Sequence, residues 1–121
     1  MDITTTAQNF EASVPLDAFV RSQLSNALGR MATDIIAIDV FMKDVNGPKG
    51  GVDKQALIRV QLRNRQIITI ESEHDNLYAA IRTGTKRTRH AVNRQLRKSR
   101  RIRKKRITDM AMPALTGAPQ A

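Results

Sequence analysis

Apolar and polar residues alternate in three stretches of the chain, and a fourth, short stretch is rich in β-branched residues. The pattern therefore predicts four strands, at residues 3–6, 35–43, 54–63 and 66–73. Asn64 and Arg65 leave just enough chain for a tight hairpin between the last two, so we expect them to be antiparallel neighbours. The residues predicted to face the core in the second and third strands are Ile36, Ile38, Val40, Met42, Ala56, Ile58, Val60 and Leu62.

Two longer stretches repeat apolar residues at helical spacing. The first, residues 14–29, follows Ser13 as N-cap and meets Gly29 as a C-terminal stop. The second begins at Asn76, with Asp75 as its cap, and is predicted to run to about residue 104. After it, residues 108–121 have no periodic core face, so we expect a domain of residues 1–107 and a disordered C-terminal tail of residues 108–121.

The predicted order of elements is β-α-β-β-β-α. Strands and helices that are each apolar on one side fit an α+β fold, a four-stranded sheet with two helices packed on one face. This arrangement resembles that of double-stranded-RNA-binding domains. The crossover through the first helix should be right-handed, which makes the first and second strands parallel.

The composition narrows the class of protein further. At 121 residues the chain has room for one modest core. It contains no cysteine, no apolar run near the ~20 residues of a membrane span, and no basic-then-apolar pattern at its start. We therefore expect no membrane partner and a cytoplasmic location.

Charge is distributed very unevenly along the chain. Residues 1–81 hold eight basic and ten acidic residues, a balance of −2, whereas residues 82–121 hold thirteen basic residues and one acid, a balance of +12. No acid stands between Asp75 and Asp109, although solvated helix faces normally mix both signs. Repulsion along such a helix is relieved by a polyanion, so nucleic acid is the expected partner. A helix lying on anionic lipid is less well supported, because its only larger apolar residues between 82 and 106 are Val92, Leu96 and Ile102.

The side chains expected to bind RNA come mainly from the second helix. On that helix they are Arg82, Lys86, Arg87, Arg89, His90, Arg94, Arg97, Lys98, Arg100 and Arg101. The loop at 44–51 is rich in glycine, but neither a Gly-Lys-Ser/Thr motif nor a helix follows it, so it is not a nucleotide-binding loop. We expect Lys49 and Lys54 to be auxiliary phosphate contacts there, with a merely solvated loop as the alternative.

No group of residues has the spacing of a catalytic or metal site. Asp34, Asp39, Asp44 and Asp53 are spread over a strand and a loop, and His74 and His90 are isolated in sequence. We predict that the protein is not an enzyme and has no metal, no cofactor and no small-molecule substrate. Tyr78, at the start of the second helix, is expected to pack rather than to stack on a base.

Two segments resemble the ribosome hibernation-promoting factor and ribosome-associated inhibitor family. The first is the helix entry Asp75-Asn-Leu-Tyr-Ala-Ala-Ile81, followed by Arg87 and Arg94. The second is the glycine-rich segment Asp44-Val-Asn-Gly-Pro-Lys-Gly-Gly-Val-Asp-Lys54, which is similar to a loop in a subgroup of short members. The resemblance covers residues 1 to about 104 and includes the order of elements.

The resemblance implies a protein that occupies the small ribosomal subunit near the decoding site in starvation or stress. Such a protein binds ribosomal RNA, excludes messenger and transfer RNA, and has no catalytic centre. By position, Arg87, Arg94 and Lys98 would bind RNA, and Tyr78 and Ile81 would pack.

The chain departs from the family pattern in two respects. Long members add a dimerisation domain, whereas 17 residues follow Lys104 here, so we expect the short form; self-association stays open. The second helix is also richer in arginine than is usual in the family, which leaves room for a more general RNA binder.

Three alternatives remain open at this point. One is a nonspecific RNA- or DNA-binding protein of the chaperone or nucleoid kind, and another is an RNA-processing enzyme, which the lack of a carboxylate or histidine cluster disfavours. The third is an adaptor that uses the uncovered face of the sheet, part of which an oligomer would cover. The residues expected on that face are Ile35, Ala37, Phe41, Leu57 and Ile67.

Overall fold

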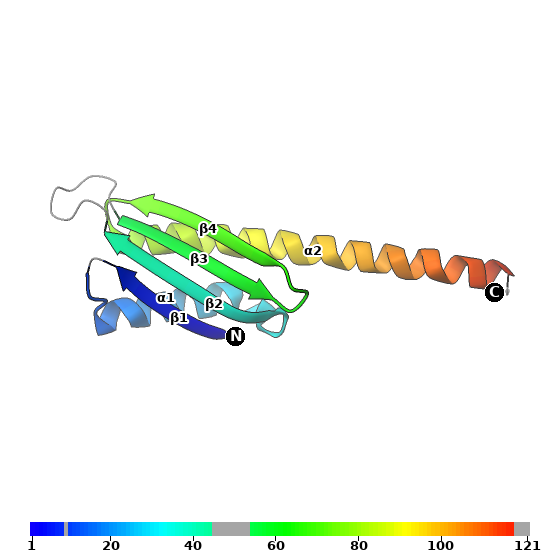
Figure 1. Cartoon of the computed structure of the whole chain (residues 1–121), viewed down its shortest axis with the longest axis horizontal. Helices are drawn as coiled ribbons and strands as arrows, with labels where there is room; N and C mark the ends of the chain where they lie inside the picture. Colours follow the sequence, from blue (N-terminus) through cyan, green and yellow to red (C-terminus); the bar gives the residue numbers. More distant parts are fainter. Residues whose placement is uncertain (9, 45–53, 118–121) are drawn as a thin grey trace. The chain divides into compact units, whose positions relative to one another are not determined.

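In the computed structural model, four strands form one sheet in the order β1-β2-β3-β4 (Figure 1). The structure describes residues 1–8, 10–44 and 54–117, without the side chains of residue 103 and of residues 106–117. The strands are β1 (Asp2–Gln8), β2 (Ile35–Asp44), β3 (Lys54–Leu62) and β4 (Ile67–His74). β1 is parallel to β2, and the β2–β3 and β3–β4 pairs are antiparallel. The predicted α+β fold and its order of elements are confirmed.

Helix α1 (Val14–Leu28) connects the two parallel strands. Its N-cap is Ser13, as predicted. The hydroxyl oxygen of Ser13 accepts a hydrogen bond from the Leu16 amide at 3.2 Å. The α-helix ends at Leu28 with Gly29 as its C-cap, as predicted. Gly29 has right-handed helical angles (φ −57°, ψ −36°) rather than left-handed ones, and the chain continues as the 3-10 helix η1 (Gly29–Asp34) before β2.

Helix α2 (Leu77–Gly117) begins one residue later than predicted. The Asn76 side chain accepts a hydrogen bond from the Tyr78 amide at 2.9 Å, so Asn76 is the capping residue rather than Asp75. The carboxylate of Asp75 instead lies 2.6 Å from Nδ1 of His74.

The far end of α2 also differs from the prediction. The helix continues to Gly117 rather than ending near residue 104. The added segment contains Ala, Met and Leu, which have high helix propensity although they form no periodic apolar stripe. Pro113, which disfavours a helix interior, is the exception in this segment. The chain divides into two compact units, Met1–Ala91 and Val92–Ala121. The predicted boundary at residue 107 remains a prediction, and residues 118–121 lie outside the described part of the chain.

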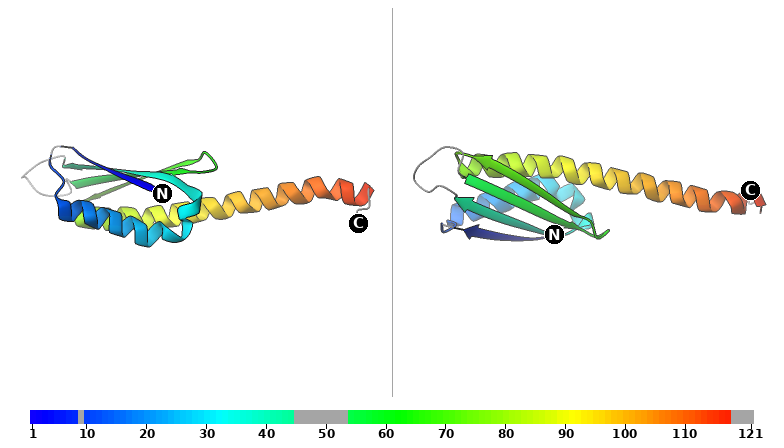
Figure 2. Two further views of the ribbon diagram at one scale, coloured as in Figure 1. Left: turned by 90° about the horizontal axis from the view of Figure 1, so that it is seen from below. Right: turned by 45° about the horizontal axis from the view of Figure 1, so that its top comes forward.

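Within the first unit, α1 and the beginning of α2 cover the same face of the sheet (Figure 2). The approach of α2 is close at Gly84, where an added Cβ atom would lie 3.1 Å from Ile58 Cδ1 and 3.4 Å from Ser72 Cβ. The two helices meet where the rings of Phe19 and Tyr78 pack edge to face, with centroids 4.9 Å apart. Ile81 is fully buried, so both residues expected to pack do so.

A β-bulge at the start of β2 overturns one prediction about the core. The register with β3 shifts between Ile35 and Ala37. A bulge adds one residue to a strand and so reverses the alternation of its side chains on one side of the insertion. As a result Ile35 is buried, whereas Ile36, which was expected in the core, is 46% exposed. The buried residues of β3, from Ala56 to Leu62, are those that were predicted.

Candidate nucleic-acid interface

In the first unit, the exposed side of α2 is basic. Arg82, Lys86 and Arg89 follow one another at spacings of four and three, so they lie on one side of the helix, and all three are exposed. His90 is exposed as well. The buried side of the same turns contains small and apolar residues, among them Ala80, Ile81, Gly84, Thr85 and Thr88. Contact with the sheet therefore uses one side of the helix and leaves the cationic side to solvent.

Arg87 lies at the flank of this basic side, next to the sheet. Its guanidinium donates a hydrogen bond of 3.4 Å to the backbone carbonyl oxygen of Glu71 in β4, while the side chain remains exposed. A guanidinium has five N–H donors, so this bond orients the group and leaves donors for a phosphate.

The second unit contains a denser group of cations. Arg94, Arg97, Lys98, Arg100 and Arg101 are all exposed. The four arginines of this group border one open hollow of about 490 Å³. Pairs such as Arg94 and Lys98 stand four residues apart, where like charges destabilise a helix by roughly 0.2–0.5 kcal/mol each. An anion held among them would relieve this repulsion.

The two auxiliary lysines have different outcomes. Lys49 lies outside the described residues. The ammonium of Lys54 is 2.9 Å from Asp44 Oδ2, and both side chains are partly buried, so Lys54 is already engaged in an ion pair. The register pairs Asp44 with Lys54 across β2 and β3. Sequence reasoning missed this pair because the two residues are ten positions apart and only the strand register brings them together.

The described residues contain no group of three or more His, Cys, Asp or Glu side chains that could hold a metal ion. Among the same residues, no helix is long and apolar enough to cross a membrane.

Comparisons with known proteins identify a family and a shared fold. The family model described as "Sigma 54 modulation protein / S30EA ribosomal protein" matches residues 3–104. A comparison with curated proteins gave no match. Among solved structures, the N-terminal domain of Protein Y from Thermus thermophilus is similar, with 25% identity and a TM-score of 0.64 over 78% of this chain and 98% of that one.

A ribosomal subunit interface protein from Coxiella burnetii is also similar in fold, with 22% identity and a TM-score of 0.61 over 83% of this chain and 98% of the other. The resemblance to ribosome hibernation factors that the sequence indicated is thereby confirmed. The chain belongs to the Sigma 54 modulation protein / S30EA ribosomal protein family.

Proposed function

We propose that this protein is a hibernation factor that binds ribosomal RNA of the small subunit near the decoding region, in the cytoplasm. It inhibits translation by occupying the space that messenger and transfer RNA need. The observation that supports the proposal most directly is the surface of α2, where nine exposed lysines and arginines between Arg82 and Arg101 are accompanied by no acid. Membership in a family described as ribosomal supports the ribosome as the partner.

The proposed mechanism needs no chemical step. Proteins recognise A-form RNA mainly through its phosphates, its 2′-hydroxyls and its shape. Arginine suits this task because its planar guanidinium can donate two parallel hydrogen bonds to one phosphate. The sheet holds the first turns of α2 in place through contacts such as that at Gly84, so the arginines from Arg82 to Arg89 are presented by a preformed helix. Little ordering is then required at the moment of binding.

Co-sedimentation in sucrose gradients tests this function. Purified protein is mixed with ribosomes and with separated subunits at low and near-physiological salt, with duplex DNA as competitor. We expect it to remain on the small subunit and on whole ribosomes at physiological salt, whether or not DNA is present. Adding messenger and transfer RNA beforehand should reduce binding, because the proposed sites overlap.

The alternative is a general polyanion binder, which the arginine-rich second unit favours. Such a protein would be lost to the DNA competitor, and its affinity would fall by about 0.7–0.9 log units per log unit of salt for each phosphate neutralised. Release at modest salt, or equal binding to both subunits, would overturn the small-subunit proposal and leave this alternative.

A further inference from the structure

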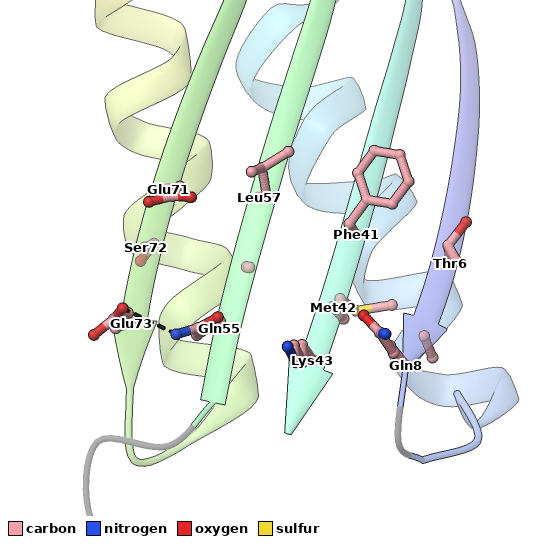
Figure 3. Close-up of a pocket in the computed structure, with 12 residues that line it drawn as sticks. Thr6, Gln8, Phe41, Met42, Lys43, Gln55, Leu57, Glu71, Ser72 and Glu73 are labelled. Atoms are coloured by element: carbon pink, nitrogen blue, oxygen red, sulfur yellow. Dashed lines mark hydrogen bonds between the residues drawn. The ribbon is translucent and has the colours of Figure 1, made fainter. Parts of the chain in front are cut away.

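The face of the sheet opposite the helices is uncovered within the first unit (Figure 2). Strand register arranges its side chains in rows that run across the sheet. One row pairs Asp39 of β2 with Arg59 of β3, and the next pairs Phe41 with Leu57. Figure 3 looks onto this face, with the side chains of Phe41 and Leu57 beside each other on adjacent strands.

Some of the exposed apolar residues of the protein lie on this face. Of the six large apolar side chains exposed in the described part of the chain, Ile36, Phe41 and Ile67 lie on this face, with exposed fractions of 46%, 42% and 55%. Phe41 and Leu57 also line a hollow of about 320 Å³. The row of Phe41 and Leu57 is separated from the row that contains Ile67 by the charged pair Asp39 and Arg59, so the face combines apolar and charged positions.

Arg59 provides an independent observation. Its Nε atom is buried and has no hydrogen-bond partner within the described residues. Nε is covered by the chain itself, but the residue as a whole is only half-buried. A guanidinium has five N–H donors, so a carboxylate above the open face would be bound by the terminal N–H groups rather than by Nε.

We propose that the open face of the sheet is the interface of a symmetric homodimer. The two-fold axis lies parallel to the strands, between β2 and β3. It places β2 of each copy over β3 of the other, so that Asp39 faces Arg59 of the second copy and Phe41 faces its Leu57. Because a two-fold interface repeats each contact, both arginines meet a carboxylate and both phenylalanines meet an apolar partner.

Charge complementarity favours an axis parallel to the strands over an axis perpendicular to them. A two-fold axis perpendicular to the strands, through the same row, would place Asp39 over Asp39 and Arg59 over Arg59 of the second copy. Like charges facing each other at an interface are unfavourable by several kcal/mol. With the axis parallel to the strands, none of the facing pairs combines like charges, including the pair of Thr6 with Glu71 on the outer strands and the pair of Lys43 with Gln55 on the central strands.

The size of the face indicates how strong the dimer is. Four strands spaced ~4.8 Å apart, each ~7 residues long, make a face of roughly 450 Å². Two such faces bury on the order of 900 Å², at the low end of specific interfaces, so we expect a weak, reversible dimer. The helices of the first unit pack on the opposite face of the sheet, so the dimer does not cover the basic side of α2 in that unit (Figure 2).

The test is sedimentation equilibrium of the full chain at near-physiological salt, after nuclease treatment so that RNA cannot bridge the molecules. We expect a monomer–dimer equilibrium for the natural protein. Asp39→Arg and Arg59→Asp should each raise the dimer dissociation constant at least about tenfold, since each places like charges together twice. An equimolar mixture of the two variants should regain the natural affinity, because every facing pair is then complementary. The double variant should dimerise with itself.

A second pair of variants distinguishes an effect on dimerisation from an effect on folding. Phe41→Ser removes an apolar contact at the proposed interface, whereas Ile102→Ser removes an equally exposed residue from α2; both side chains are 42% exposed. Only Phe41→Ser should weaken the dimer, and melting curves confirm that each variant is folded. A natural protein that stays monomeric up to several hundred micromolar would overturn the proposal. Failure of the two charge variants to restore each other would do the same.

Discussion

The two helices of this protein use the same packing principle and differ in what they expose. α1 buries Leu16, Val20, Leu24 and Leu28 on one side, and its exposed side contains both signs, including an ion pair of 2.8 Å between Asp17 and Arg21. α2 buries a comparable side in its first turns but exposes only cations among its charged residues as far as Arg101. The comparison shows that the spacing of apolar residues determines which side of a helix packs, whereas the residues of the other side determine which charges the helix presents to solvent.

Among the tests of this difference between the helices, charge reversal on α2 should have the largest effect, on ribosome binding. In the variant Arg87→Glu/Arg94→Glu, two of the proposed charge-assisted phosphate contacts, expected to contribute about 1.5–3 kcal/mol each, would become repulsive. We expect ribosome binding to weaken at least about a hundredfold, measured by co-sedimentation at physiological salt, with the melting temperature nearly unchanged.

The matched control is Arg30→Glu/Arg65→Glu, which makes the same change in net charge at exposed arginines outside α2. It should bind with nearly the natural affinity. Equal losses in the two variants would mean that net charge, and not the surface of α2, decides binding.

Substitution of one glycine in each helix tests how closely the two helices pack. A side chain at position 84 meets Ile58 and Ser72, so Gly84→Val should destabilise the fold by about 1–3 kcal/mol and lower the melting temperature by several degrees. Gly29, at the end of α1, has right-handed angles and no atom within 4 Å of the added Cβ, so Gly29→Ala should stabilise by about 0.4–1 kcal/mol. Thermal unfolding measures both changes, and a stable Gly84→Val protein would contradict the close approach of α2.

Asp17 of α1 has no acidic counterpart on the exposed side of α2 as far as Arg101, and its contribution to stability depends on pH. The carboxylate of Asp17 accepts a hydrogen bond of 2.6 Å from the Thr5 hydroxyl and one of 2.8 Å from Arg21. The Thr5 bond above all, and then Arg21, lower the pKa of Asp17 below its usual value of 3.8. The stabilisation is therefore present above about pH 4 and is lost as the pH falls through the lowered pKa.

In Asp17→Asn we accordingly expect a flatter decline of melting temperature below about pH 4 than in the natural protein. Asp2→Asn, which removes an exposed carboxylate of β1, is the control. Parallel curves for Asp17→Asn and the natural protein would show that these bonds contribute nothing to stability.

The smallest effect is expected at the end of α2. Removing residues 108–121 should change the melting temperature by no more than about one degree, since no core residue is predicted there. A fall of several degrees on deletion would mean that the segment packs against the rest of the protein.

Local patterns in the sequence predicted most of this fold. Alternation along β3 and helical spacing in α1 depend on neighbours a few residues apart, so they could be interpreted without knowing the pairing of strands. The composition of the exposed side of α2 was equally accessible, because no acid interrupts it from Asn76 to Thr108. The basic residues expected on that helix are all exposed as far as Arg101.

The predictions from the sequence were wrong or incomplete where contacts between residues distant in sequence determine the structure. The bulge that exchanges Ile35 and Ile36 exists only in the register between β2 and β3, and the ion pair of Lys54 with Asp44 depends on the same register. Asp75 and Asn76 were both suitable caps by residue type, and the structure has Asn76 accepting the Tyr78 amide hydrogen bond while Asp75 lies beside His74. Likewise, the Nε atom of Arg59 is buried and has no hydrogen-bond partner within the described residues, a property that no local pattern reveals.

The parallel position of β1 has a consequence for the order in which the chain folds. Partners in the β3–β4 hairpin are as close as Gln61 and Ile67, whereas β1 pairs with residues about 35 positions away, such as Ile3 with Ile38. Short loops close at a smaller entropic penalty, so the meander of β2, β3 and β4 can form before β1 arrives. We therefore expect that the strand synthesised first at the ribosome is among the last to join the sheet.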